Sequence, residues 1–173
     1  MTTLEIFEEI KAALAAIALD ATNDPKGEKL FEAVELYPNE NLGRALQELL
    51  VLKSRAALVV PLAIRRVIND RSGGLSVMGR KYAEIAIIYS DKAFFKFSQV
   101  VAFGGTKNLG LFAFDEKIEE ALTGKEITPF GGIVLGDSDP LVLSVEEQKQ
   151  APGRQAWLIQ GFVPVGLIAS AVV

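Results

Sequence analysis

The side chains most often used in catalysis are absent from this 173-residue chain, which contains neither histidine nor cysteine. Nucleophilic catalysis by an activated thiol or by a Ser-His-Asp triad is therefore excluded, and so are metal sites built from thiolate or imidazole ligands. The chemistry that remains belongs to carboxylate, lysine, tyrosine and serine side chains. An enzyme built on these groups would need them gathered in one concave pocket.

Three short motifs have residue types found in binding or catalytic sites, but not the required spacing. Residues 104–107 (GGTK) contain the glycines and lysine of a phosphate-binding loop, without the Walker order G-x-x-x-x-G-K-[ST]. Asp137 and Asp139 begin a calcium-loop pattern, which the following proline and leucine interrupt. Glutamate pairs such as Glu119–Glu120 fit solvated helix faces. We therefore expect no catalytic residue, no cofactor and no metal, and predict that the protein is not an enzyme.

Charge is unevenly distributed along the chain. Residues 1–52 carry a net charge of −6, residues 53–107 carry +7 and residues 108–173 carry −5, within a total of −4. Three arrangements fit this pattern: a monomer that pairs its own segments, unlike charged faces meeting between two copies, or nucleic-acid binding by residues 53–107. Phenylalanines 94, 95 and 97, interspersed with lysines, could stack bases, although packing in a core or subunit contact is the favoured interpretation.

Helical periodicity is present in three segments. Residues 2–18 begin with Thr2 and Glu5 at capping-box spacing, and apolar residues follow at intervals of three and four. That stripe consists of Leu4, Phe7, Ile10, Leu14 and Ile17. A second helix is expected from about residue 42 to residue 52, and a third over residues 111–122, closed by Gly124.

Strand patterns occupy the intervals between these helices. A short strand is expected within residues 29–37, followed by strands at 56–64 and 81–90 that form a long hairpin. Pro61 inside the first hairpin strand predicts an edge position or a bulge. The hairpin tip, near residues 65–80, is expected to protrude and to present four candidate contact residues: Arg65, Arg66, Arg71 and Arg80.

The C-terminal third suggests more β-structure. Strands at 133–135 and 141–145 are expected to flank a turn at 136–140, and a final strand is expected at 155–165. The uncharged segment 166–173 (GLIASAVV) is either a core strand or a segment that docks on another chain. Its candidate contact residues are Leu167, Ile168, Val172 and Val173.

Together these elements predict a single α+β domain over residues 1–173, with helices packed on a mostly antiparallel sheet of about four to five strands. The longest apolar run, residues 161–173, contains a proline and is too short to span a bilayer. We therefore expect no association with a membrane.

The order of these segments resembles the tail terminator, or tail completion, proteins of long-tailed phages. The resemblance is carried by the N-terminal helix, the junction at Ala121–Pro129 and five further segments, and it departs from the usual pattern at residues 92–109. The five segments are RAALVVPL (55–62), KYAEIAIIYSD (81–91), GLFAFDEKIEEALTGKEI (110–127), GGIVLGDSDPLVL (131–143) and RQAWLIQGFVPV (154–165).

This resemblance implies a structural virion protein that caps the tail tube as a homo-oligomeric ring, usually of six copies, and offers the head a joining surface. Its partners would be the tail tube protein and the head–tail connector protein, with the sheath protein added in a contractile tail. It would be found in the host cytoplasm during assembly and then in the virion tail. The alternative function is a small nucleic-acid-binding module that uses the basic segment 53–107.

Overall fold

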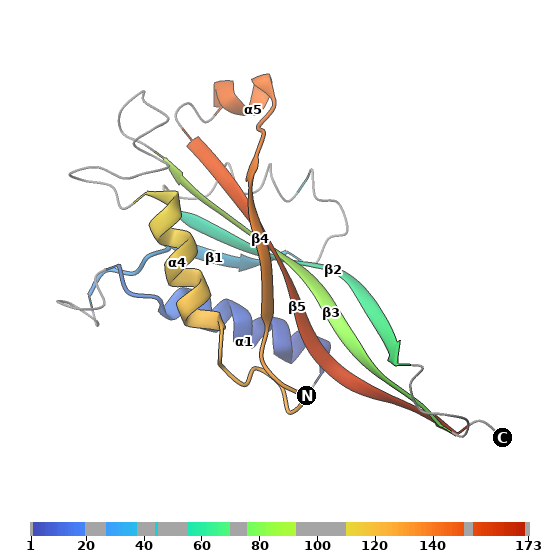
Figure 1. Ribbon diagram of the computed structural model, residues 1–173. Helices are drawn as coiled ribbons and strands as arrows, with labels where there is room; N and C mark the ends of the chain where they lie inside the picture. The colour runs from blue at the N-terminus through green and yellow to red at the C-terminus, as the bar shows by residue number, and fades with distance from the viewer. Residues whose placement is uncertain are drawn as a thin grey trace.

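A computed structural model of the chain describes residues 2–19, 27–37, 44, 55–69, 76–92, 110–150 and 154–171. The elements are α1 (Thr3–Ala16), β1 (Ala33–Leu36), β2 (Ala56–Asn69), β3 (Ser76–Lys92), α4 (Leu111–Leu122), β4 (Val134–Leu141), α5 (Val145–Gln150) and β5 (Arg154–Ala171). The strands form one sheet in the order β1-β2-β3-β5-β4 (Figure 1). Because only the β1–β2 pair is parallel, the expected α+β fold with a mostly antiparallel sheet is confirmed.

The start of α1 follows from its capping box. The backbone N–H of Glu5 donates to Thr2 Oγ1 at 3.2 Å, and the backbone N–H of Thr2 donates to the Glu5 carboxylate at 2.5 Å. The buried stripe of the helix contains Ile6, Phe7, Ile10 and Leu14. Leu4, which was expected on that stripe, is 61% exposed instead. At 3.6 residues per turn, Leu4 lies roughly a third of a turn away from the centre of the buried stripe.

Two helices cover one face of the sheet, which we call the helix-covered face. α1 and α4 pack there against alternate residues of the central strands, such as Ala57, Ile85 and Ile159. On α4, the buried Phe114 meets Phe31 edge-to-face, with 5.7 Å between the ring centroids. The C-terminal end of α4 is followed by Gly124 at φ +79°, the left-handed residue that the sequence predicted. The opposite face carries a smaller buried cluster around Leu58 and Ile88.

The long hairpin is formed by β2 and β3, and its strands are longer than predicted. Residues 65–69 and 76–80 are paired strand residues rather than a turn, because the ladder continues to Asn69 opposite Met78. The arginines at 65, 66 and 80 therefore lie on strands. The register shifts between Pro61 and Ala63, which confirms the predicted bulge at the proline.

The predicted second hairpin at 133–145 is wrong. Residues 136–140 continue the single strand β4, which pairs antiparallel with β5, and Val145 begins the helix α5. β4 is an edge strand of the described sheet, where a proline and exposed carboxylates are tolerated because one side of the strand has no described strand beside it to bond. A register shift between Leu135 and Ser138 accommodates the glycine and aspartate between them.

The final strand also extends beyond its predicted end. β5 continues past Pro164 to Ala171, and its last residues pair with the first residues of β3, so that Ala171 lies opposite Ser76. Residues 166–171 are thus a strand of this chain's own sheet. Several predicted features lie outside the described residues: the helix at 42–52 apart from Arg44, the motif at 104–107, and the phenylalanines at 94, 95 and 97.

Candidate interaction surface

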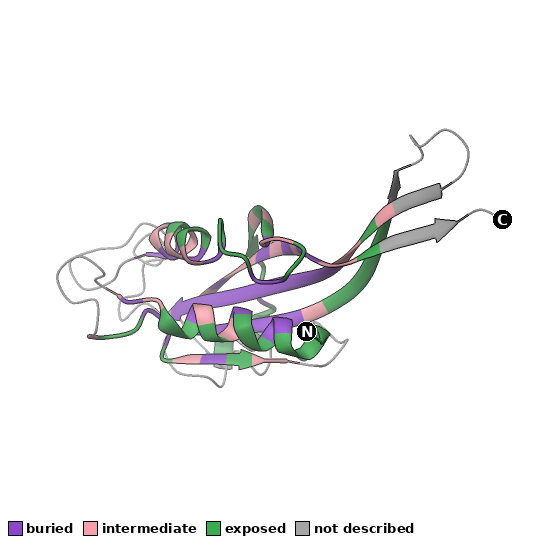
Figure 2. Cartoon of the chain, turned by 90° about the horizontal axis from the view of Figure 1, so that it is seen from below, coloured by how far each residue is buried: buried purple, intermediate pink, exposed green. Residues whose placement is uncertain are grey.

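β2, β3 and β5 extend past the helices as a three-stranded arm, which we define as residues 62–69, 76–82 and 164–171 (Figure 2). β1 pairs only with residues 56–59 of β2, and β4 pairs only with residues 156–162 of β5. In the described part of the chain, both outer edges of the arm therefore have no neighbouring strand. Such edges are surfaces on which proteins associate.

The arm also exposes apolar side chains. Ile64 is 43% exposed, Val67 is 52% exposed and Leu167 is 61% exposed. Val67 and Leu167 both lie opposite Arg80 and share one face of this projecting ribbon, while Ile64, opposite Ala83, lies on its other face. Apolar residues scattered singly over a surface need no explanation, but here both faces of one ribbon expose them, and the ribbon has no helix beneath it. This combination is typical of a contact surface.

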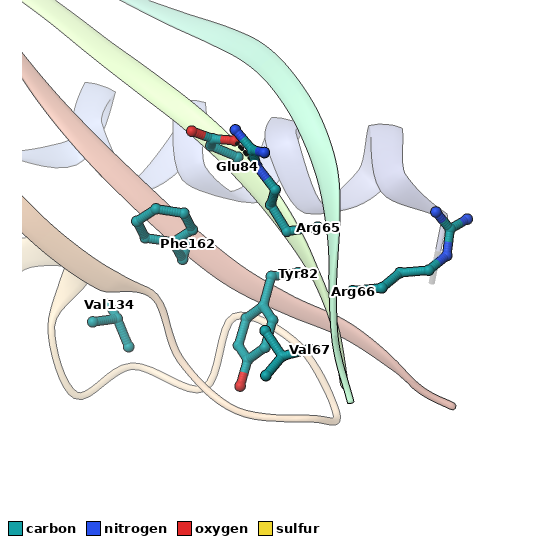
Figure 3. A pocket seen from close by; sticks show the side chains of 7 residues that line it. All are labelled: Arg65, Arg66, Val67, Tyr82, Glu84, Val134 and Phe162. Carbon is teal, nitrogen blue, oxygen red and sulfur yellow. Dashed lines mark hydrogen bonds and ion pairs between the residues drawn. The ribbon is translucent and has the colours of Figure 1, made fainter. Parts of the chain in front are cut away.

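A hollow of about 590 Å³ lies on the face of the sheet away from α1, at the base of the arm (Figure 3). The strand register shows which face of the sheet the hollow is on. Ala83 packs in the core of the helix-covered face, so its neighbours Tyr82 and Glu84 point to the opposite face. Phe162 is paired directly with Glu84 and therefore shares its face. The lining residues are Arg65, Arg66, Val67, Tyr82, Glu84, Val134 and Phe162.

Glu84 is a buried carboxylate at this hollow, and both of its oxygens accept hydrogen bonds. Arg65 Nε donates to Glu84 Oε2 at 2.6 Å, and Gln160 Nε2 donates to Glu84 Oε1. The hydrogen bond from Arg65 and the charge of Glu84 together raise the pKa of Arg65, which therefore remains a cation. With its oxygens occupied, Glu84 fixes the position of Arg65, while most of the Arg65 side chain stays exposed.

Three of the sequence-predicted contact residues lie on the same face as the hollow. Arg65 is directly opposite Tyr82, and Arg80 is directly opposite both Val67 and Leu167. Because opposed residues share a face and alternate residues return to it, Arg65, Arg80 and Leu167 lie on one side of the arm. The exposed face of the arm thus combines positive charge with apolar surface.

Of the five remaining predicted contact residues, two lie elsewhere on the arm and three lie outside the described residues. Arg66 is exposed and pairs with Lys81, and its side chain points away from the other six residues around the hollow (Figure 3). Ile168 is paired with Gly79 within the arm. Three predicted contact residues lie outside the described residues: Arg71, Val172 and Val173.

Sequence reasoning did not identify most of the hollow. Tyr82, Glu84, Val134 and Phe162 come from three strands that are distant in sequence, and only the sheet order brings them together. One signal was present: Glu84 is a single carboxylate inside the apolar run from Tyr82 to Tyr89. A buried charge of that kind needs a partner, which here is Arg65.

A second polar cluster joins α4 to the sheet. The buried Tyr89 hydroxyl donates to Asp115 Oδ1 at 2.9 Å, and Ser138 Oγ donates to the same carboxylate oxygen. Burial, followed by the charge and the hydrogen bond of Asp115, raises the pKa of Tyr89 well above its ordinary value of 10.0. The phenol is therefore protonated at neutral pH and acts as a donor that positions α4, not as a base or nucleophile.

Replacing Tyr89 with phenylalanine tests this cluster. We expect Tyr89→Phe to lower the free energy of unfolding by about 1.5–3 kcal/mol, the usual contribution of a hydrogen bond to a charged group. Because folding favours the protonated phenol, its contribution is complete below the unfolded pKa and is lost as pH rises above about 10. Urea unfolding of both proteins at pH 7 and pH 10.5 measures this, and the difference between them should shrink at the higher pH. Tyr82→Phe, at a half-buried site, is the control; an equal loss in that variant would contradict the role of Asp115.

Within the described residues, no group of three or more acidic side chains is arranged to hold a metal ion. The helices described are all too short or too polar to cross a membrane. No protein-family model matches the chain, and no curated protein matches it. Among the described residues, the arm and its hollow are the features that bear on function.

Proposed function

We propose that this protein is a structural assembly protein whose copies join through their arms into a ring, and that the ring caps a phage tail tube. One observation carries the proposal: a three-stranded arm projects beyond the helices and exposes apolar residues, among them Val67 and Leu167. Strands of 17 and 18 residues are about three times the usual length. Strands of this length extend beyond the body of the domain, where they can contact another molecule.

The two faces of the molecule support a closed ring rather than a symmetric pair. The outer surfaces of α1 and α4 carry exposed glutamates, whereas the arm carries exposed cations. The glutamates are Glu5, Glu8, Glu9, Glu116, Glu119 and Glu120, and the cations are Arg65, Arg66 and Arg80. A ring forms when one patch repeatedly meets a different patch on the next copy, and unlike charges favour that contact.

The resemblance in element order to tail terminator proteins supplies the biological setting. It implies a ring of about six copies that contacts the tail tube protein on one side and the head–tail connector protein on the other. A contractile tail would add the sheath protein. None of these contacts requires a catalytic residue or a cofactor.

The mass of the purified protein in solution tests the proposal. We expect wild-type protein to form rings, seen as a defined oligomer by light scattering and as closed particles by negative-stain microscopy. Leu167→Asp places a charge on the exposed arm and should give monomers. Val142→Asp is the matched control, because Val142 is 93% exposed and lies between β4 and α5, and α5 lies away from the arm in Figure 1. A wild-type protein that is monomeric at every concentration and does not bind tail tubes would contradict the proposal.

The same samples also test the alternative function, a nucleic-acid-binding module using residues 53–107. Its support is that Arg66 and Arg80 are exposed and form no ion pair within the described residues. Salt-dependent DNA binding by a monomer, lost when both arginines are replaced with alanine, would favour this alternative. The ring proposal predicts assembly without added nucleic acid.

A further inference from the structure

We infer that the hollow at the base of the arm is the socket for the first turn of α1 from a second copy of this chain, with Leu4 as the inserted side chain. This inference rests on the proposed ring and specifies its contact. Both surfaces are formed by described residues, and they lie on opposite faces of one molecule.

The apolar surfaces of the two sites are complementary. Tyr82, Phe162 and Val134 form the apolar part of the hollow, and Val134 is 63% exposed there. Leu4 is 61% exposed on the outer side of α1. The capping box of Thr2 and Glu5 fixes the turn that carries Leu4, so little order needs to be gained when it docks. A branched aliphatic side chain against aromatic walls is a typical central contact of an interface.

The charges around the two sites are opposite in sign. Glu8 is exposed on α1 one turn after Leu4, and it forms no ion pair in the described residues. Arg80 is exposed on the same face as the hollow and forms no ion pair in the described residues, whereas the charge of Arg65 is balanced by Glu84. The carboxylate beside the inserted leucine therefore meets a guanidinium group beside the socket, which favours the correct partner and orientation.

The placement of the two sites on opposite faces determines the type of assembly. A contact between two identical arm faces would bring Arg65 and Arg80 of one copy against the same residues of the other. Docking of α1 into the hollow avoids this repulsion and leaves one free socket and one free α1 after each addition. Such a heterologous contact can continue until a ring closes.

Other exposed apolar residues fit the socket less well. Phe112 on α4 is packed edge-to-face on Trp157, with ring centroids 4.8 Å apart, so it would have to leave that contact to dock. Val142 is more exposed than Leu4, but Lys149 on the following helix α5 offsets the glutamates nearby. Leu4 combines an exposed apolar side chain with a capped helical turn, and Lys11, the cation of α1, is paired with Glu35.

Two single variants and their mixture test the inference. Leu4→Asp damages the inserted surface and Val134→Asp damages the socket, and both residues are exposed, so circular dichroism and thermal unfolding should match wild type. Each variant alone should weaken self-association by at least about 30-fold, the loss expected when a central contact residue is replaced. Val142→Asp, which adds the same charge elsewhere, should assemble normally.

The mixture of the two variants distinguishes docking of unlike surfaces from other contacts. Leu4→Asp retains an intact socket and Val134→Asp retains an intact α1, so an equimolar mixture should form a 1:1 heterodimer by mass photometry. No ring should appear, because the second contact of each pair carries both damaged surfaces. Adding salt should weaken the heterodimer, since its charges are partly exposed.

Each other outcome overturns the inference. If Leu4→Asp forms rings like wild type, α1 is not the inserted element, although the proposed ring remains. If both variants are monomeric but their mixture gives no heterodimer, the two residues do not belong to one complementary contact. If wild-type protein never associates, the proposed function and this inference fail together.

Discussion

Replacing Phe114 with alanine is expected to lower the free energy of unfolding by about 3–5 kcal/mol. Phe114 is fully buried on α4, where its ring packs edge-to-face on Phe31 and against the helix-covered face of the sheet. Alanine would leave a cavity that the surrounding strands can fill only by moving. Urea unfolding followed by circular dichroism measures the loss, because it reports on the helices and the sheet together.

Phe112 provides the matched control for this substitution. It lies on the same helix two residues earlier and is 44% exposed, and its ring contacts Trp157 edge-to-face. Phe112→Ala should cost only about 1 kcal/mol, the order of one aromatic pair. Equal losses in the two variants would mean that α4 does not pack through Phe114 as described.

The substitution Gly132→Ala is expected to lower the free energy of unfolding by about 3 kcal/mol, at the upper end of the usual cost of overpacking. A Cβ at this position would lie 2.4 Å from the carbonyl oxygen of Lys125. That oxygen belongs to the backbone of the segment between α4 and β4, so the clash cannot be relieved by a rotamer change. Relief would require the backbone at Lys125 and the backbone at Gly132, which belong to the same segment, to move apart.

A second glycine serves as the control for this prediction. An added Cβ at Gly166 would meet only the flexible Lys81 side chain, at 3.9 Å. Gly166→Ala should therefore change stability by less than about 0.5 kcal/mol, as is usual for surface substitutions. The two variants should be compared by thermal and urea unfolding. A Gly132→Ala protein as stable as wild type would contradict the close approach of Gly132 to the carbonyl oxygen of Lys125.

Local sequence signals predicted α1 and α4 well, but they did not predict α5, whose first residue was expected to end a strand. The capping box at Thr2 and Glu5, the apolar stripe of α4 and the terminating Gly124 are all interactions between residues close in the chain. Leu4 was assigned to the buried stripe because its spacing fits, but the exact direction of the stripe depends on the sheet beneath it. Spacing alone cannot determine that direction.

β4 shows the opposite case, in which local chemistry was misleading. Asp137, Ser138, Asp139 and Pro140 favour a turn when they are considered alone. In the structure they form an edge strand, since β5 supplies one row of hydrogen-bond partners and the sheet formed by the described strands ends at β4. Edge position is a property of the whole sheet, so it could not be obtained from a five-residue pattern.

The candidate interaction surface was predictable only in composition. The charge of the middle segment made Arg65, Arg66 and Arg80 candidate contact residues, and all three are exposed. Their arrangement around a hollow was not predictable, because it depends on the pairing of β3 with both β2 and β5. Val134 and Phe162 are ordinary apolar strand residues in the sequence. They contribute to the hollow only because the sheet places them beside Tyr82 and Glu84.

The position of β5 within the sheet has a consequence for biosynthesis. β5 is the last described strand in the chain, yet it lies between β3 and β4 and pairs with β3 over its whole length. The ribosome must release the chain as far as residue 171 before that pairing is complete. Until then the apolar β3 has an open edge, so we expect the nascent chain to depend on chaperones late in translation and to aggregate when synthesis stops early.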